Sequence, residues 1–228
     1  MIGIIIQARM SSTRLQGKVL KIIGNKTLLG HILFRLQYLK TEADVVVATS
    51  TERVNDAIFD FCLANNTKCF RGSEENVVNR FYECAKLYSY SHIVRLTADN
   101  PFTDIEELDK LIGNHILTKA DYSKSVTVLP HGIGAEVFTM DSLEKSNKNT
   151  DKIIHLEYVD EYITNNPTKF TINSFTDIRK SKQRPDIRLT VDTADDYKKA
   201  CFIVENCSDE FITTEEAIRL CLEFDNLS

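Results

Sequence analysis

Short apolar runs rich in β-branched residues alternate along this chain with amphipathic segments of helical period. The runs fall at residues 2–7, 44–49, 68–70 and 92–97, and apolar positions three or four apart follow each of them. Parallel strands that are buried on both faces by crossover helices produce this pattern. The sequence therefore predicts an α/β fold, a mostly parallel sheet with helices on both faces.

The amphipathic segments predict helices whose apolar sides cover that sheet. Their expected ranges are 27–39, 54–65, 74–88, 104–118, 140–148, 151–165 and 213–224. Thr27 and Ser73 are the predicted N-caps of two of these helices. Thr193 and Asp196 have the spacing of a capping box, which predicts the start of one more helix.

The second half of the chain is expected to add further β-structure. Strands are predicted at 169–174 and 187–191, and residues 121–139 have the composition of β-structure interrupted by a Pro-His-Gly-Ile-Gly stretch. The length of 228 residues and the apolar content of 43% suit one domain over residues 1–228. The β-rich part, within about residues 121–165, is a candidate insert for dimerisation.

Composition argues against several classes of function. The net charge is −5 and the basic residues are few and local, which argues against general nucleic-acid binding. No stretch approaches the length of a transmembrane helix, so no membrane partner is expected. The six cysteines include no C-x-x-C pair, which predicts buried free thiols and a cytoplasmic location.

The basic residues gather at the amino end. The first 41 residues hold seven of the 28 basic residues and none of the 33 acidic residues. The strand at 2–7 runs into a polar loop that carries Arg9, Arg14 and Lys18. A loop at the carboxyl end of a strand in an α/β sheet often binds a phosphorylated ligand. A nucleoside triphosphate, with about four negative charges, needs fixed cations of this kind.

This loop lacks the G-x-x-x-x-G-K-[ST] motif of a P-loop and the G-x-G-x-x-G motif of a dinucleotide-binding fold. From the residues alone, it is either a phosphate-binding loop or an ordinary basic surface loop.

Two acidic residues follow predicted strands. Asp99 comes after the strand at 92–97, and Asp192 comes after the one at 187–191. Each suits a Mg²⁺ ligand at the carboxyl edge of a sheet. Each also suits a cap or turn before the next helix, which is the commoner role of Asp. Together, opposite the cationic loop, the two carboxylates would form a Mg²⁺–triphosphate site.

Other polar residues give weaker signals. Arg71 either contacts a phosphate or a base edge, or is a solvated surface residue. Arg80 and Arg95 are candidates for internal salt bridges. The five histidines lack metal-ligand spacing, and no serine or cysteine has the surroundings of a nucleophile.

Five segments carry motifs that occur together in one family. Residues 8–20, ARMSSTRLQGKVL, resemble A-R-x-x-S-[ST]-R-L-P-G-K-x-L. Residues 46–50 resemble V-V-A-T-S, and residues 70–77 resemble F-R-G-S-E-x-x-V. Residues 95–101 resemble R-x-T-A-D-x-P, and residues 189–197 resemble L-T-[LV]-D-x-x-x-D-[YF]. The chain thus resembles the CTP-dependent sugar-acid cytidylyltransferases (the Kdo and acylneuraminate enzymes), and most closely their spore coat polysaccharide biosynthesis protein F branch.

The resemblance implies a nucleotide-diphospho-sugar transferase fold, which is Rossmann-like, and a homodimer. It implies that CTP lies over the first strand and its loop, with Mg²⁺ held by Asp99 and Asp192. Arg14 and Lys18 would hold the triphosphate. The residues implied around the nucleotide are Ala8, Arg9, Arg71 and Ser73.

The chain departs from this branch at three places. Gln16 replaces the usual proline. Gly134 replaces the aspartate of P-x-G-[LI]-D-V-E-V-F, although Glu136 is kept. Residues 156–159, LEYV, replace R-E-H-V, so an arginine and a histidine are missing while Glu157 is kept. The second and third of these segments would line the acceptor side, where Glu136 and Glu157 are the candidate substrate-binding residues. The nucleotide half therefore carries over better than the identity of the acceptor.

The sequence thus predicts a nucleotidyltransferase that transfers CMP from CTP to a sugar acid and releases pyrophosphate, for the synthesis of a surface or spore polysaccharide. One alternative is an enzyme of the same fold that acts on a non-sugar or phosphorylated acceptor. Another is a non-catalytic nucleotide-binding protein. The expected partners are CTP, a small acidic sugar or related acceptor, and a second copy of the chain, without nucleic acid or membrane.

Overall fold

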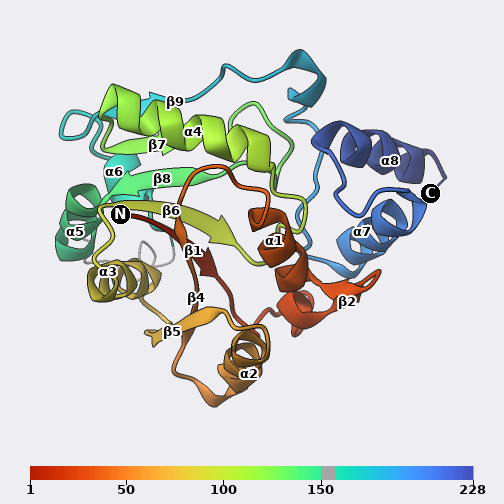
Figure 1. The fold of residues 1–228 in the computed structure, drawn as a ribbon, viewed down its shortest axis with the longest axis horizontal. Coiled ribbons are helices and arrows are strands. Elements are labelled where there is room, and N and C mark those ends of the chain that lie inside the picture. Colours follow the sequence, from red (N-terminus) through yellow and green to blue (C-terminus); the bar gives the residue numbers. More distant parts are fainter. Residues whose placement is uncertain (150–157, 228) are drawn as a thin grey trace.

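The apolar runs form the strands of one sheet in the computed structural model, which describes residues 1–149 and 158–227 (Figure 1). The strands of the sheet are β1 (Ile2–Gln7), β4 (Asp44–Ser50), β5 (Lys68–Gly72), β6 (His92–Thr97), β7 (Tyr122–Lys124), β8 (Glu136–Thr139) and β9 (Ile172–Ser174). Their order across the sheet is β5-β4-β1-β6-β8-β7-β9. Two short strands, β2 (Ile22–Ile23) and β3 (Lys26–Thr27), pair with each other outside it.

The sheet is mostly parallel, as predicted. β1 lies between β4 and β6 and is parallel to both, and β4 is parallel to β5. β8 is antiparallel to its neighbours β6 and β7, while β7 and β9 are parallel. The interior of β1 is fully buried, as expected of a central strand that helices cover on both faces.

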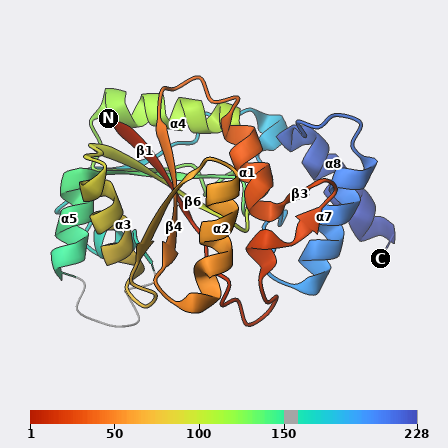
Figure 2. The same ribbon diagram turned by 60° about the horizontal axis from the view of Figure 1, so that its bottom comes forward.

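Helices cover both faces of the sheet. In the described part of the chain they are α1 (Leu28–Leu36), α2 (Asp56–Ala64), α3 (Val77–Leu87), α4 (Ile105–Thr118), α5 (Met140–Asn149), α6 (Glu161–Thr164), α7 (Ala194–Asn206) and α8 (Thr214–Leu227). One core forms beneath α1, α2 and α4 and continues to α7 and α8, and a second forms beneath α3 and α5. The positions of these helices around the strands can be followed in Figure 2. Among the described helices, none has the length and apolar character needed to span a bilayer.

Two predicted helix starts are confirmed. The side chain of Thr27 accepts a hydrogen bond from the N–H of Gly30 at the start of α1. Thr193 and Asp196 form the predicted capping box at the start of α7, each side chain accepting a backbone N–H of the other.

The predicted cap of α3 is wrong. The helix begins at Val77, three residues later than predicted, and the side chain of Asn76 accepts the N–H of Asn79 as its cap. Ser73 Oγ accepts the N–H of Asn76 in the preceding turn. The physical reason is that β5 continues through Gly72. Residues 73–76 therefore form the turn between the strand and the helix.

Residues 187–191 do not form the predicted strand. Within the described residues, their ladder contact is a single bridge between Arg188 and His131. Val191 donates its N–H to the carbonyl of Asp99, which lies in another loop. Loops instead of strands flank the segment, so its apolar side chains are buried without a ladder of backbone hydrogen bonds.

The β-rich segment is part of the main sheet. β8 has β6 and β7 as neighbours, and β7 has β8 and β9. Neither strand therefore presents a free edge for pairing with a second copy of the chain, and the homodimer stays a prediction. Of the helix predicted at 151–165, residues 151–157 lie outside the described residues, and the remainder contains the short helix α6.

A glycine in the central strand gives a test of this packing. A Cβ atom at Gly3 would lie 2.1 Å from Cδ2 of Tyr90, whose side chain is fully buried. Gly3→Ala is therefore expected to lower the free energy of unfolding by about 1–3 kcal/mol, measured by urea denaturation.

Gly113 in α4 is the matched control, because a Cβ atom there would have no described atom outside the helix backbone within 4 Å. Gly113→Ala is expected to raise the free energy of unfolding by about 0.5–1 kcal/mol, because alanine has the higher helix propensity. Equal stabilities for Gly3→Ala and the wild type would contradict the described packing of β1.

Candidate active site

The carboxyl ends of β1 and β6 lie where the path of the chain across the sheet reverses. From β1 the chain proceeds to β4 and β5 on one side, and then returns to β6 on the other. Gln7 at the end of β1 is in register with Thr97 at the end of β6. The two following loops therefore leave the sheet side by side, at the crevice where open α/β sheets bind ligands.

A cavity of about 770 Å³ lies at this crevice. Its walls come from the loop after β1, the end of β6, the segment between β7 and β8, and the residues just before α7. The predicted site residues that line it are Arg9, Arg14, Lys18, Asp99, Glu136 and Asp192. The fold thus gathers six of the predicted residues around one space.

The loop after β1 is held in a defined shape. Gly17 has a φ of 65°, which glycine adopts without strain, and its N–H donates to the carbonyl of Met10. The N–H of Met10 donates to Oδ1 of Asn55 at 2.8 Å, and Ser11 Oγ donates to Oε1 of Glu74 at 2.7 Å. These contacts close the loop into a turn, so the cations that it carries have fixed backbone positions.

Lys18 connects the two predicted acids. It begins the short 3₁₀ helix η1 (Lys18–Leu20), which the buried side chain of Val19 anchors in the core. Its Nζ atom donates to Oδ2 of Asp99 and to Oδ1 of Asp192, each at 2.6 Å. Lys18 is 7% exposed, so this contact, here called the Lys18 bridge, is largely shielded from water.

Backbone hydrogen bonds hold the two acids in place for their contact with Lys18. The N–H of Val191 donates to the carbonyl of Asp99 at 2.9 Å. Asp196 Oδ2 accepts the N–H groups of Asp192 and Thr193 at 3.0 and 2.9 Å. The capping box of α7 therefore also fixes the backbone of Asp192, whose carboxylate faces Lys18.

Two arginines also contact Asp192. Arg14 Nη2 lies 3.0 Å from Oδ1, and Arg188 Nη2 forms an ion pair with Oδ2. Burial by itself would raise the pKa of Asp192. The hydrogen bond and charge of Lys18, with the charges of Arg14 and Arg188, outweigh burial and lower that pKa. Asp192 is thus kept ionised beside these three cations.

A buried ion pair forms another wall of the cavity. Arg95 Nη1 donates to Oε2 of Glu136, and the hydroxyl of Tyr122 donates to Oε1. Burial would lower the pKa of Arg95, but the charge and hydrogen bond of Glu136 outweigh it and raise that pKa. The salt bridge expected of Arg95 is therefore present, and both carboxylate oxygens of Glu136 are bound to protein donors.

Three predicted nucleotide-binding residues lie outside the cavity lining. Ala8 is buried in the core, Arg71 Nε donates to the carbonyl of Ser50, and Ser73 lies in the turn before α3. Their roles toward a nucleotide stay predictions. Glu157, the remaining candidate, lies outside the described residues.

Arg80 differs from its expected role as a salt-bridge residue. It is 1% exposed, and its Nη1 donates to the carbonyl of Ser73 at 2.6 Å. Its Nε and Nη2 have no hydrogen-bond partner among the described residues. Burial lowers the pKa of Arg80 to about 10, and the nearby charge of Glu74 opposes this shift. Unpaired buried donors are uncommon in native proteins, and no sequence signal distinguishes this arginine from an ordinary helix residue.

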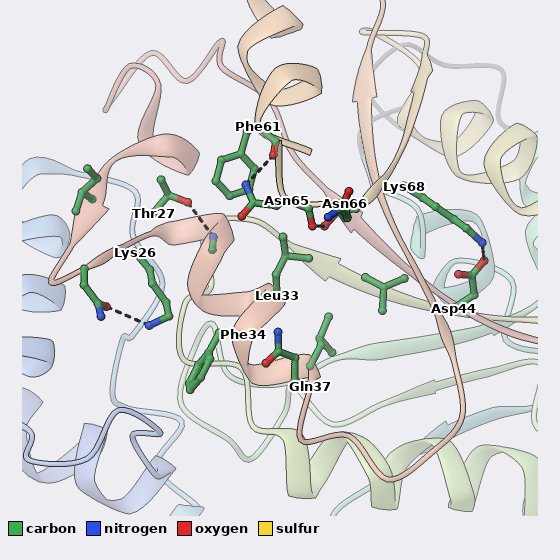
Figure 3. A pocket seen from close by; sticks show the side chains of 16 residues that line it. Lys26, Thr27, Leu33, Phe34, Gln37, Asp44, Phe61, Asn65, Asn66 and Lys68 are labelled. Carbon is green, nitrogen blue, oxygen red and sulfur yellow. Dashed lines mark hydrogen bonds and ion pairs between the residues drawn. The ribbon is translucent and has the colours of Figure 1, made fainter. Parts of the chain in front are cut away.

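A second cavity, of about 700 Å³, lies beside α1 and α2 at the amino ends of β4 and β5 (Figure 3). Asp44 is the acidic residue among its described lining residues, and its Oδ2 accepts a hydrogen bond from Lys68 at 2.6 Å. This cavity therefore lacks the opposed carboxylates that Asp99 and Asp192 supply at the other edge of the sheet. The cavity at the carboxyl ends is the candidate active site.

The nucleotide-diphospho-sugar transferase fold implied by the resemblance is confirmed, and the family that the chain matches makes it a nucleotidyltransferase. The cytidylyltransferase family profile matches residues 3–221, which is nearly the whole chain. The chain belongs to the cytidylyltransferase family.

Individual relatives agree with this assignment. The chain is 40% identical over 194 residues to the uncharacterized protein MJ1063 of Methanocaldococcus jannaschii, covering 85% of this chain and 79% of that protein. It is 37% identical over 199 residues to the spore coat polysaccharide biosynthesis protein SpsF of Bacillus subtilis, covering 85% and 82%. The solved structure of a cytidylyltransferase from Leptospira borgpetersenii is similar with a TM-score of 0.91 at 29% identity, covering 99% and 95%.

The buried pair of Arg95 and Glu136 can be tested by a double-mutant cycle. Glu136→Met removes one partner and leaves the largely buried guanidinium of Arg95 without its ion-pair partner. It is expected to lower the free energy of unfolding by about 3–5 kcal/mol in urea denaturation.

The double variant Arg95→Met/Glu136→Met removes both charges and is expected to lie closer to the wild type than the single variant does. Additive effects of the two substitutions would show that the pair is not coupled in the folded protein.

Proposed function

We propose that the protein transfers CMP from CTP to a hydroxyl group of a sugar acid and releases pyrophosphate, for the synthesis of a surface or spore polysaccharide. The family assignment supplies the reaction class. The proposal for the acceptor rests on the match of the nucleotide-side motifs to sugar-acid enzymes. A relative named for spore coat polysaccharide biosynthesis supports the pathway.

The Lys18 bridge is the observation that carries this proposal. Asp99 and Asp192 follow different parts of the fold, and both carboxylates accept a hydrogen bond from the side chain of Lys18. The cations Arg9 and Arg14 line the same cavity. A cavity lined by two carboxyl groups and by the cations of the loop after β1 suits a polyphosphate bound together with a divalent cation.

The donor set fits Mg²⁺. In the described ranges, no group of three or more His, Cys, Asp or Glu side chains is arranged to hold a metal ion. Mg²⁺ commonly uses one or two carboxylates together with substrate phosphates and water. We therefore propose Asp99 and Asp192 as its protein ligands. When bound, the ion would neutralise phosphate charge and polarise the reacting phosphoryl group.

The residues of the chain would act mainly by position and charge. Arg14 and Lys18 would hold the triphosphate and neutralise the charge that builds on the pyrophosphate as it leaves. An acceptor oxygen would attack the α-phosphorus of CTP in line. The bond from the α-phosphorus to the oxygen that bridges the α- and β-phosphates would break, that oxygen would leave with pyrophosphate, and the proton of the acceptor hydroxyl would pass to water. Alignment of acceptor and phosphate in one cavity supplies much of the rate enhancement.

The acceptor would lie against the wall formed by residues 126–136. Glu136, proposed as a substrate-side residue, is already bound by Tyr122 and Arg95, which favours shaping of this wall over proton abstraction. A Cβ atom at Gly134 would lie 3.0 Å from Cα of Val126. The wall is therefore closely packed where the related motif has an aspartate. This difference keeps a non-sugar or phosphorylated acceptor as the second candidate.

The proposed ligands can be tested by substitution. Asp99→Ala and Asp192→Ala are each expected to reduce pyrophosphate release from CTP by at least about 10²–10³-fold, because each removes a ligand of the charge-neutralising cation. Asp195→Ala is the control: this neighbouring acid is 86% exposed at its side chain and contacts Lys198. Its activity should stay within about twofold of the wild type. Full activity in both ligand variants would refute the assignment.

The acceptor can be identified by its product. CTP, Mg²⁺ and a panel of sugar acids, phosphorylated sugars and non-sugar alcohols are incubated with the protein, and pyrophosphate release is measured. A sugar acid is expected to give one phosphodiester signal in ³¹P spectroscopy. A phosphorylated acceptor would give the two coupled signals of a diphosphate instead, which would decide for the second candidate.

A further inference from the structure

The ammonium group of Lys18 lies where a bridging cation would lie. Its Nζ atom is 2.6 Å from Oδ2 of Asp99 and 2.6 Å from Oδ1 of Asp192. The side chain is 9% exposed, and those of the two acids are 23% and 16% exposed. One buried positive charge thus satisfies both acids at once, which is the task assigned above to a divalent cation.

The remaining contacts of Asp192 strengthen this neutralisation. Arg14 Nη2 lies 3.0 Å from the same oxygen that Lys18 contacts, and Arg188 pairs with the other oxygen. Arg188 Nε also lies 3.4 Å from Oδ1 of Asp196. Three side-chain cations therefore contact Asp192, and one of them, Lys18, also contacts Asp99. A free divalent ion that approached the two acids would meet positive charge and would have to displace Lys18.

A nucleoside triphosphate would compete with the two acids for these cations. Its oxygens offer Lys18 and Arg14 new anionic partners, so both cations can leave the acids without becoming unpaired. Lys18 can make this move without a change of fold. Its backbone is fixed by η1 and the buried Val19, while the lysine side chain has a flexible four-carbon stem.

We propose that Lys18 and the divalent cation compete for the same position between Asp99 and Asp192. The protein then binds the cation only together with a nucleoside triphosphate, and Lys18 transfers from the acids to the phosphate oxygens as the pair enters. This inference rests on the proposed function, because it uses the same two acids as cation ligands. It adds that the cation binds together with the nucleotide and not before it, which does not follow from the reaction class or from the shape of the cavity.

This competition is tested by measuring the binding of Mn²⁺ to the protein through the electron paramagnetic resonance signal of the free ion. The wild type is expected to bind Mn²⁺ weakly without nucleotide, and roughly tenfold or more tightly with CTP. Lys18→Met removes the charge and keeps much of the side-chain volume. It is expected to bind Mn²⁺ without nucleotide roughly tenfold more tightly than the wild type.

Lys21→Met is the matched control. It removes the same charge from the same basic segment, but Lys21 lies over the ring of Tyr197 and is not among the described residues that line the cavity. Its affinity for Mn²⁺ should equal that of the wild type. Thermal unfolding of each variant confirms that it is folded, and Lys18→Met/Asp192→Ala should lose the Mn²⁺ binding that Lys18→Met gains.

Two results separate this inference from the function on which it rests. If the wild type binds Mn²⁺ with CTP while Lys18→Met gains no affinity without it, the competition is refuted and the function stands. If Mn²⁺ binding with CTP is also insensitive to Asp192→Ala, the cation ligands of the proposed function are wrong as well.

Discussion

One lysine ammonium between two carboxylates organises this site. Lys18 comes from the loop after β1, Asp99 from the end of β6, and Asp192 from the segment before α7. They meet because the N–H of Val191 bonds to the carbonyl of Asp99 and because Val19 anchors Lys18 in the core. Any one of these charges would be costly to bury alone. Each charge in the arrangement is therefore offset by the others, and the arrangement requires the reversal of the chain at β1 that sets the loops side by side.

The parts of the fold that are decided locally can be predicted from the sequence. The strand at 2–7 is apolar because both of its faces are covered, and the capping box of Thr193 and Asp196 is decided within four residues. The wrong predictions depend on distant neighbours. Residues 187–191 have the alternation of a strand, but loops flank them, so no ladder forms. The start of α3 shifts because β5 continues through Gly72.

The sequence also locates most charged residues of the site, but not how they pair. Asp99 and the loop cations can be predicted from their places after apolar runs, whereas a phosphate loop and a basic surface loop look alike until the family resemblance separates them. The position of Lys18 between the acids depends on three segments and has no local signal. The same holds for Arg80, because tertiary packing decides that this helix arginine is buried with Nε and Nη2 unpaired among the described residues.

Diffraction from crystals grown with CTP and Mn²⁺ tests the central claim most directly, because the anomalous signal locates the ion independently of the chain. We expect one manganese peak between Asp99 and Asp192, with the phosphates against Arg14 and Lys18 and the Lys18 bridge broken. Manganese away from these two carboxylates, or CTP in the cavity beside α1 and α2, would contradict the account.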